Sequence, residues 1–338
     1  MIHLRYLYLS SDSCSPRTIT EYLSELWNLQ FLKIVRSSTG RDDDDEKGRL
    51  KLRKVNQLRH IMCYGFSLSL LIEKEVINSD DNNGGGGGGL LKNLQTLIGL
   101  DAEFCVEDVL SMTPNLVTLH LISKGTIISQ NQLVILPLLL KRLQKLELSC
   151  KIVANPEICH QNITHLVLRN TQINGGYLMR ALRKLHKNLR VLELLIRSVS
   201  FTKEGEAGVL DFSSSDGDDD DDGFGQLTFL KLEDLKGLKE WKMSVGVMPS
   251  LQKVSVKLCR DLERLPSEAL KAIPTLQELE LDSYHEQLRT DAKRLAEEHL
   301  PKDQLKLLIV VMDLVDLLSE TFSKWPTTSQ HNKPTSLS

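Results

Sequence analysis

This chain of 338 residues has few aromatic residues and no large excess of either charge. Phe, Trp and Tyr make up 5% of the sequence, and 42 Lys and Arg face 45 Asp and Glu, for a formal net charge of −3. Proteins that bind nucleic acid through bulk charge carry a basic excess, and those that stack single-stranded bases carry aromatic platforms. Both absences argue against a nucleic-acid-binding protein.

Long apolar runs and closely paired cysteines are also lacking. The longest apolar stretches are Leu133–Leu140, interrupted by Pro137, and Leu307–Met312, and a membrane-spanning helix needs about 18 residues. No signal-peptide pattern follows Met1, and the six cysteines form no CxxC pair. We therefore expect a cytoplasmic protein with reduced thiols and no integral membrane segment.

Leucine, by contrast, is abundant. The sequence holds 63 leucines, about 19% of the chain, although hydrophobic residues together reach only 41%. Leucine therefore replaces other apolar residues. One apolar side chain used so often is typical of a structural repeat.

The pattern L-x-x-L-x-L, in which Ile, Val or Cys can replace a leucine, recurs eleven times. Eight of the ten spacings between copies are 20 to 29 residues, the length of a leucine-rich repeat. In the fourth copy, Gly99 stands where the last leucine is expected. The copies begin at Leu4, Leu29, Leu58, Leu94, Leu116, Leu143, Ile163, Leu189, Leu227, Leu251 and Leu276.

This spacing predicts an α/β leucine-rich-repeat solenoid. The centre of each repeat forms a short strand whose alternate side chains point inward, and stacked repeats bury a continuous leucine core. We expect a curved parallel β-sheet on the concave face and short helices and loops on the convex face. Helices are predicted at Tyr177–His186 and Arg289–Leu300, and a last strand at Leu305–Val311.

The repeats predict one domain over residues 1–318, with about 11 to 12 repeats. Flexible inserts near 40–48, 78–90 and 203–225 are polar or rich in glycine, and the last two explain the long spacings of 36 and 38 residues. Residues 319–338 read as a disordered tail.

Several stretches resemble the leucine-rich-repeat region of plant coiled-coil NLR (NB-LRR) disease-resistance proteins, with the late-blight-resistance-like and RPP-type subgroup the nearest. Residues 251–266 follow the cytoplasmic plant form LxxLxLxxCxxLxxLP. The other stretches are IHLRYLYL (2–9), LWNLQFL (26–32), LKNLQTL (91–97) and LEDLKGLKEW (232–241). The resemblance covers roughly residues 1–311.

The resemblance implies a non-enzymatic recognition module of a plant intracellular immune receptor. Such a module contacts a pathogen effector or a guarded host protein, and its N-terminal repeats hold a nucleotide-binding domain inactive, in cis or in trans. No GxxxxGK[ST] motif is present, so we expect no cofactor and a truncated or partial receptor. The alternatives are a leucine-rich-repeat substrate adaptor or scaffold, for example in a ubiquitin-ligase complex, and a nonfunctional truncation product.

No catalytic or metal site is expected. The GxGxxG match at 84–89 lies in an all-glycine run, and the half calcium loop at 218–223 has Phe229 where a bidentate Glu is required. The histidines are scattered, and Cys259 occupies the packed cysteine position of its repeat.

The expected partner-binding residues point outward from the concave face, with aromatic side chains on the first strands and alternating charge on the later ones. Without the twelve acids of 42–46 and 211–222, the net charge of −3 becomes about +9. A basic face that docks an acidic protein surface, with the acidic loops as competitors, is a further hypothesis. The candidates are Tyr6, Tyr8, Lys33, Tyr64, His120, Glu147, Arg169, Glu193, Lys231, Ser255, Lys257 and Glu280.

Overall fold

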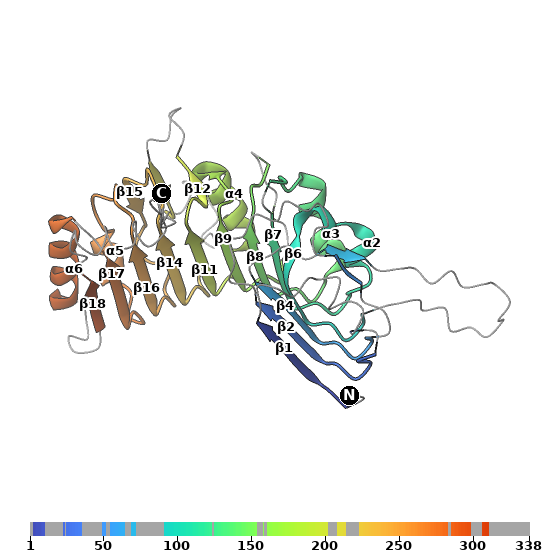
Figure 1. Cartoon of the computed structure of the whole chain (residues 1–338). Helices are drawn as coiled ribbons and strands as arrows, with labels where there is room; N and C mark the ends of the chain where they lie inside the picture. The colour runs from blue at the N-terminus through green and yellow to red at the C-terminus, as the bar shows by residue number, and fades with distance from the viewer. Residues whose placement is uncertain are drawn as a thin grey trace, which may run out of the picture.

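A computed structural model describes residues 3–10, 23, 25–35, 49–51, 55–64, 69–71, 91–123, 125–153, 158, 161–201, 208–213, 223–282, 285–298 and 306–310. Its main feature is one twelve-stranded sheet in which all neighbouring strands are parallel and follow chain order (Figure 1). The strands are β1 (Tyr6–Ser10), β2 (Phe31–Val35), β4 (His60–Tyr64), β6 (Thr96–Asp101), β7 (Thr118–Ile122), β8 (Lys145–Ser149), β9 (His165–Arg169), β11 (Val191–Leu195), β14 (Phe229–Glu233), β16 (Lys253–Lys257), β17 (Glu278–Asp282) and β18 (Lys306–Val310).

Each strand coincides with one predicted repeat or with the predicted last strand, which confirms the α/β class and the long parallel sheet. Equivalent inward residues pair across neighbouring strands, as Leu7 does with Leu32 and Leu32 with Ile61. The alternating side chains of each strand separate an inward leucine set from an outward set. The same register therefore brings the inward residues of β1 to β17 into one core.

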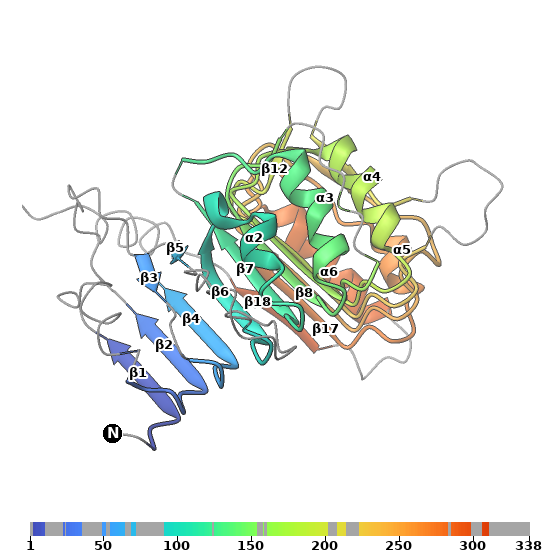
Figure 2. The same cartoon turned by 90° about the vertical axis from the view of Figure 1, so that its right-hand side faces the viewer.

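The remaining elements lie on one side of the main sheet (Figures 1 and 2). Residues 175–185 and 286–298 confirm the two predicted helices with shifted ends. The helices are η1 (Ala102–Phe104), α2 (Glu107–Leu110), α3 (Gln130–Leu139), α4 (Gly175–Leu185), α5 (Ser267–Lys271) and α6 (Glu286–Glu298). Three two-stranded sheets pair β3 (Arg49–Lys51) with β5 (Ser69–Leu71), β10 (Ile173–Asn174) with β12 (Val199–Ser200), and β13 (Val209–Asp211) with β15 (Glu240–Lys242).

The core lies between the main sheet and these elements. Leu32, Leu119 and Leu230 are fully buried, as are most of the leucines that begin the repeats, such as Leu29 and Leu251, whereas Leu4 of the first repeat is partly buried. Burial of one leucine side chain stabilises the fold by roughly 1.5–3 kcal/mol. Because the leucines of successive repeats form one cluster, each repeat is stabilised by its neighbours.

The fourth repeat departs from the prediction at Gly99. β6 carries a bulge between Ile98 and Leu100, so Leu100 and not residue 99 pairs with Leu121 and is fully buried. Gly99 adopts φ +90°, and a Cβ atom there would lie 2.4 Å from the backbone oxygen of Cys63. Only glycine fits this backbone, and the extra residue returns a leucine to the core.

The predicted insert at 203–225 also differs in part. Val209–Asp211 forms β13, and Leu210 and Phe212 are buried because apolar residues alternate along this segment. The Phe212 ring meets the Phe224 ring edge-on, with centroids 5.6 Å apart. The inserts near 40–48 and 78–90, the GxGxxG match, the aspartates 218–222 and residues 319–338 lie outside the described residues.

A side-chain hydrogen bond also joins successive repeats. In six repeats, the residue before the first apolar position donates to the backbone carbonyl that lies two residues before the first apolar position of the preceding repeat, at 2.6 to 2.9 Å. Each bond satisfies a loop carbonyl outside the sheet ladder. The pairs are Asn93 with Asn56, Asn115 with Lys92, Asn162 with Lys141, Asn188 with Gln161, Ser250 with Gly225, and Thr275 with Pro249.

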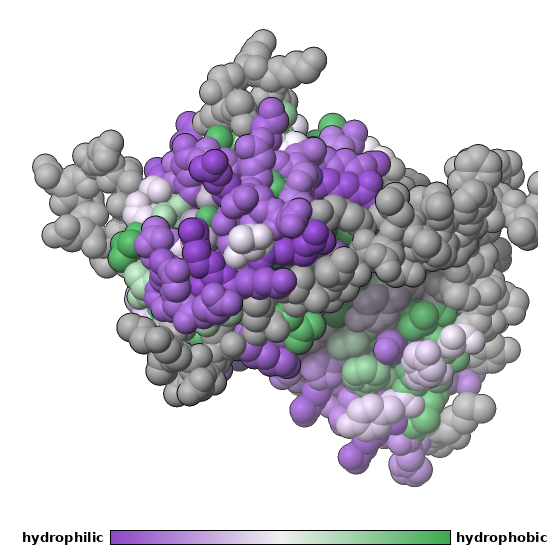
Figure 3. All heavy atoms as spheres, turned by 90° about the vertical axis from the view of Figure 1, so that its left-hand side faces the viewer, coloured by the Kyte–Doolittle hydropathy of each residue, from purple (hydrophilic) through white to green (hydrophobic). Residues whose placement is uncertain are grey.

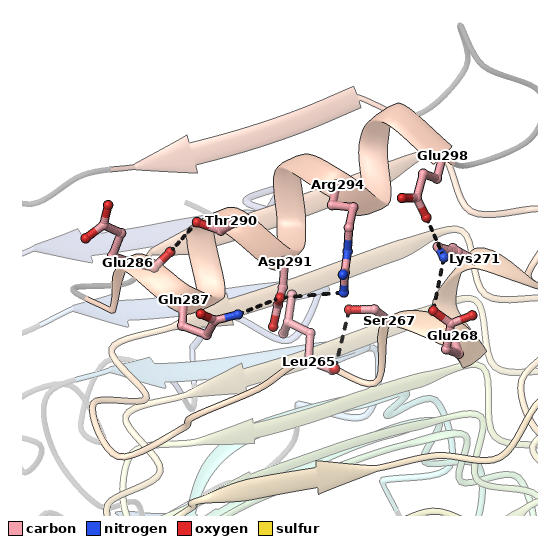
Figure 4. Close-up of polar contacts among 10 residues, drawn as sticks. All are labelled: Leu265, Ser267, Glu268, Lys271, Glu286, Gln287, Thr290, Asp291, Arg294 and Glu298. Atoms are coloured by element: carbon pink, nitrogen blue, oxygen red, sulfur yellow. Dashed lines mark hydrogen bonds and ion pairs between the residues drawn. The ribbon is translucent and has the colours of Figure 1, made fainter.

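Beside β17 and β18, α6 packs against α5 (Figure 4). The ammonium of Lys271 on α5 lies 3.0 Å from a carboxylate oxygen of Glu268 and 2.5 Å from one of Glu298, at the end of α6. Leu288 and Leu295 of α6 are buried in the core. The helix therefore covers core leucines with its apolar side and contacts α5 through its polar side.

Candidate functional site

The face of the main sheet away from the core, here called the open face, carries one outward residue of every strand at the same register. This central row crosses all twelve strands, and two flanking rows lie two residues before and after it. On β6 the bulge instead places Asp101, three residues after Ile98, in the later row. The central row consists of Tyr8, Lys33, Met62, Ile98, His120, Glu147, Val167, Glu193, Lys231, Ser255, Glu280 and Leu308.

All twelve predicted partner-binding residues lie on strands with their side chains on the open face. Eight of them belong to the central row, Tyr6 lies in the row before it, and Tyr64, Arg169 and Lys257 lie in the row after it. Ser255 differs from the others because it is only 1% exposed. Its hydroxyl donates to Glu280 at 2.9 Å, so it positions a carboxylate within this face.

Aromatic side chains gather at the β1 end of the open face. The ring centroids of Tyr6 and Phe31 lie 6.0 Å apart, and those of Phe31 and His60 lie 5.9 Å apart. We call the group formed by Tyr6, Tyr8, Phe31, Lys33, His60 and Tyr64 the aromatic surface. Figure 3 views the molecule from the α6 end, which is hydrophilic, and shows pale and green residues on the N-terminal strands at lower right.

Lys33 occupies the centre of the aromatic surface. Its ammonium lies 5.5 Å from the centroid of the Tyr8 ring and 5.6 Å from that of Tyr64. The negative faces of aromatic rings attract a cation at such distances. The two rings therefore hold the lysine between β1 and β4.

The aromatic surface contains no carboxylate among its own residues. The nine outward residues of β1, β2 and β4 include no Asp or Glu. Burial, together with the charge of Arg59, lowers the pKa of His60. Burial also raises the pKa of Tyr64, with a further contribution from the negative charge of Glu147. The surface is thus neutral to weakly cationic.

The middle of the open face holds a Ser–His pair that the sequence analysis missed. The Nε2 atom of His120 lies 2.9 Å from the hydroxyl of Ser149 on the neighbouring strand. Glu147 lies 3.6 Å from this same nitrogen, whereas a catalytic triad needs its carboxylate at the other ring nitrogen. Burial, with Arg169 and Lys145 nearby, lowers the pKa of His120 to about 4, which makes it a weak base.

Ion pairs dominate the part of the open face formed by β14, β16 and β17. The ammonium of Lys231 lies 2.5 Å from Glu233, and that of Lys253 lies 3.0 Å from Glu278. Lys257 lies 2.7 Å from Glu280. Burial opposes ionisation of Glu280, but hydrogen bonds from Lys257 and Ser255 hold its pKa below the ordinary value. We call Lys231, Glu233, Lys253, Lys257, Glu278 and Glu280 the charged surface.

The described cysteines are packed thiols. Cys63, Cys105, Cys150 and Cys259 are buried, and burial raises the pKa of each to about 12. A thiol with such a pKa is a poor nucleophile near neutral pH. The prediction that Cys259 is packed in its repeat is confirmed, while Cys14 and Cys159 lie outside the described residues.

Comparisons with known proteins give no family. The chain matches no protein-family model, and no curated protein matches it significantly. Within the described ranges, no helix combines the length and apolar character needed to cross a membrane. Nor do three or more His, Cys, Asp or Glu side chains of these residues come together as metal ligands.

Proposed function

We propose that this chain is a leucine-rich-repeat solenoid that binds other proteins through the concave side of its sheet, the open face. The central row of outward side chains across twelve parallel strands carries this proposal. Such a row offers a broad, continuous surface, whereas the leucines beneath it are buried in the core. Extended concave surfaces of stacked repeats commonly bind proteins.

The resemblance of the L-x-x-L-x-L stretches to plant coiled-coil NLR proteins supports a more specific role. In this role, the chain is the cytoplasmic, non-enzymatic recognition module of an immune receptor and needs no cofactor. Its partners are a pathogen effector or guarded host protein, and a nucleotide-binding domain that the N-terminal repeats hold inactive. The effector would favour the active receptor by its differential affinity for the two states.

A binding experiment with two matched charge reversals tests this proposal. The tagged chain is mixed with a separately purified nucleotide-binding domain of a coiled-coil NLR, and retention is compared for the wild type, Lys33→Glu and Arg180→Glu. Arg180 lies on α4, and its guanidinium carbon is 4.4 Å from the Tyr177 ring centroid. Both variants therefore reverse a cation that stacks on tyrosine, but only Lys33→Glu alters the open face.

We expect Lys33→Glu to reduce retention and Arg180→Glu to leave it unchanged. Equal retention of all three proteins would contradict binding through the open face. Absence of binding by the wild type would contradict the inhibitory role assigned to the N-terminal repeats.

A further inference from the structure

The cations of the open face differ in how their charge is balanced. Lys231, Lys253 and Lys257 of the charged surface each lie within 3.0 Å of a carboxylate. The ammonium of Lys33 instead lies over the rings of Tyr8 and Tyr64. A ring face balances a cation less completely than a carboxylate does, so the aromatic surface retains the ability to bind an anionic group.

The aromatic surface also carries most of the exposed large apolar side chains found on the described strands of the main sheet, Leu308 being the other one. Tyr6 is 69% exposed, Tyr8 60% and Tyr64 40%, in a chain with 5% aromatic residues. Buried aromatic side chains contribute strongly to protein interfaces, and tyrosine combines a large apolar ring with a polar hydroxyl. Three exposed tyrosines, two of them flanking Lys33, therefore form an anchor for a partner.

We propose that the aromatic surface binds an acidic segment of a protein partner, an inference that rests on the proposed function of the open face. A carboxylate of the segment pairs with Lys33, and a neighbouring apolar side chain packs against Tyr6 and Phe31. The six-ångström spacing of the Tyr6, Phe31 and His60 rings is close to the distance between alternate side chains of an extended peptide, about 6.6 Å.

The charges around the surface favour an acidic partner over a basic one. The nine outward residues of β1, β2 and β4 offer no carboxylate to a basic segment, and the charge of Arg59 acts on His60. A nucleic-acid strand is disfavoured because it needs a series of cations along its backbone, and among these nine outward residues Lys33 is the one lysine or arginine.

Peptide selection with the purified chain tests the proposal. Random nine-residue peptides displayed on phage are selected on the wild-type chain, and the affinities of enriched peptides are measured by fluorescence anisotropy. We expect enrichment of Asp or Glu beside an aromatic or aliphatic residue. Lys33→Glu and the double variant Tyr8→Ala/Tyr64→Ala should each weaken binding by about tenfold or more, as expected for interface anchors.

Three controls separate a lost contact from other effects. Lys33→Arg keeps the charge and should retain most of the peptide affinity. Arg180→Glu and Lys257→Glu should change the peptide affinity by no more than about twofold, because neither residue lies on the aromatic surface. Circular dichroism and the melting temperature confirm that each variant is folded. A labelled single-stranded oligonucleotide is tested on the wild type, with and without the best peptide.

The outcomes separate this inference from the proposed function. Four results would each overturn the inference. The enriched peptides lack acidic residues, no peptide is enriched, Lys33→Glu binds the peptides with unchanged affinity, or the oligonucleotide competes with the peptide. If Lys257→Glu weakens binding while Lys33→Glu does not, the open face still binds proteins but at the charged surface. If open-face variants and Arg180→Glu all leave peptide binding unchanged, both proposals fail.

Discussion

The aromatic surface and the charged surface lie on the same sheet, over the same kind of leucine core, and differ almost completely. Of the nine outward residues on β14, β16 and β17, seven are charged, whereas one of the nine on β1, β2 and β4 is a lysine. Beneath both, the inward residues pair in the same register. The strand alternation thus lets the surface chemistry change along the sheet while the core stays constant.

The two surfaces also differ in what a partner would have to displace. Carboxylates already satisfy the cations of the charged surface, so a partner must break or desolvate ion pairs there, and desolvation can exceed the Coulombic gain. At the aromatic surface, a partner covers exposed rings that each bury about 150–250 Å² when enclosed. The aromatic surface is therefore the more favourable place for association.

Truncation of an inward leucine should show how far the constant core extends. We expect Leu230→Ala to lower the free energy of unfolding by about 2–5 kcal/mol, the usual range for a fully buried leucine, because Leu230 is fully buried. Leu7→Ala should have a smaller effect, since Leu7 is only partly buried against the core. Urea unfolding monitored by circular dichroism measures both, and an equal loss would show that β1 is packed as tightly as β14.

Acid should destabilise the middle of the open face. The pKa of His120 is about 4 in the folded chain against an ordinary 6.5, so the unfolded chain binds more protons between these values and stability falls as the pH drops through that window. The loss by pH 4 is up to about 3 kcal/mol. The raised pKa of Glu147 acts in the opposite direction and offsets part of it.

The variant His120→Gln isolates this contribution. Urea midpoints measured between pH 7 and pH 4 should fall less steeply for the variant than for the wild type. The charged surface adds its own acid sensitivity, because the lowered pKa of Glu280 makes its stabilisation disappear as the pH falls. Parallel curves for wild type and variant would contradict the assignment to His120.

The hydrogen bonds between repeats should stabilise both halves of the molecule to a similar extent. Asn115→Ala removes a 2.8 Å bond to the carbonyl of Lys92, and Ser250→Ala removes a 2.6 Å bond to that of Gly225. We expect each change to cost about 0.5–1.5 kcal/mol, the usual net value of one hydrogen bond. Thermal melting compares them, and unchanged melting temperatures would assign the bonds no role in stability.

The smallest expected effect contrasts a paired and an unpaired charge. Glu280→Gln weakens the contact between Glu280 and Lys257, whose side chains are 17% and 33% exposed, and should cost about 1 kcal/mol, the upper end for ion pairs near the surface, and less at high salt. Lys33→Gln should leave the melting temperature unchanged, because its contacts are two exposed tyrosine rings. A larger loss from Lys33→Gln than from Glu280→Gln would reverse the distinction between the two surfaces.

The repeat spacing was sufficient to predict the strands and which of their residues point outward, because inward leucines alternate with the surface positions. It did not reveal the bulge at Gly99, since a bulge depends on a local φ angle and not on the hydrophobic pattern. The buried β13 was hidden by polar neighbours on both sides in the sequence. The asparagines before the first leucines, such as Asn93 and Asn115, were a visible signal of the hydrogen bonds between repeats.

The contacts across the open face were harder to predict. His120 and Ser149 are 29 residues apart in the chain and meet because their strands are neighbours in register. The same register places Lys257 opposite Asp282 and diagonal to Glu280. Aligning the repeats with one another predicts which outward residues are neighbours on the sheet. Side-chain rotamers then decide which of these neighbours form a hydrogen bond or an ion pair.

The hydrogen bonds between repeats affect how freely the residues of the open face can change in evolution. Their acceptors are backbone carbonyls, which every residue type supplies, and the donors lie outside the central row. Point mutations in that row, for example at Met62 or Glu193, can therefore change the chemistry of the open face while the hydrogen bonds between repeats stay intact. The binding surface can therefore evolve by substitutions on one strand at a time, without loss of the contacts that stack the repeats.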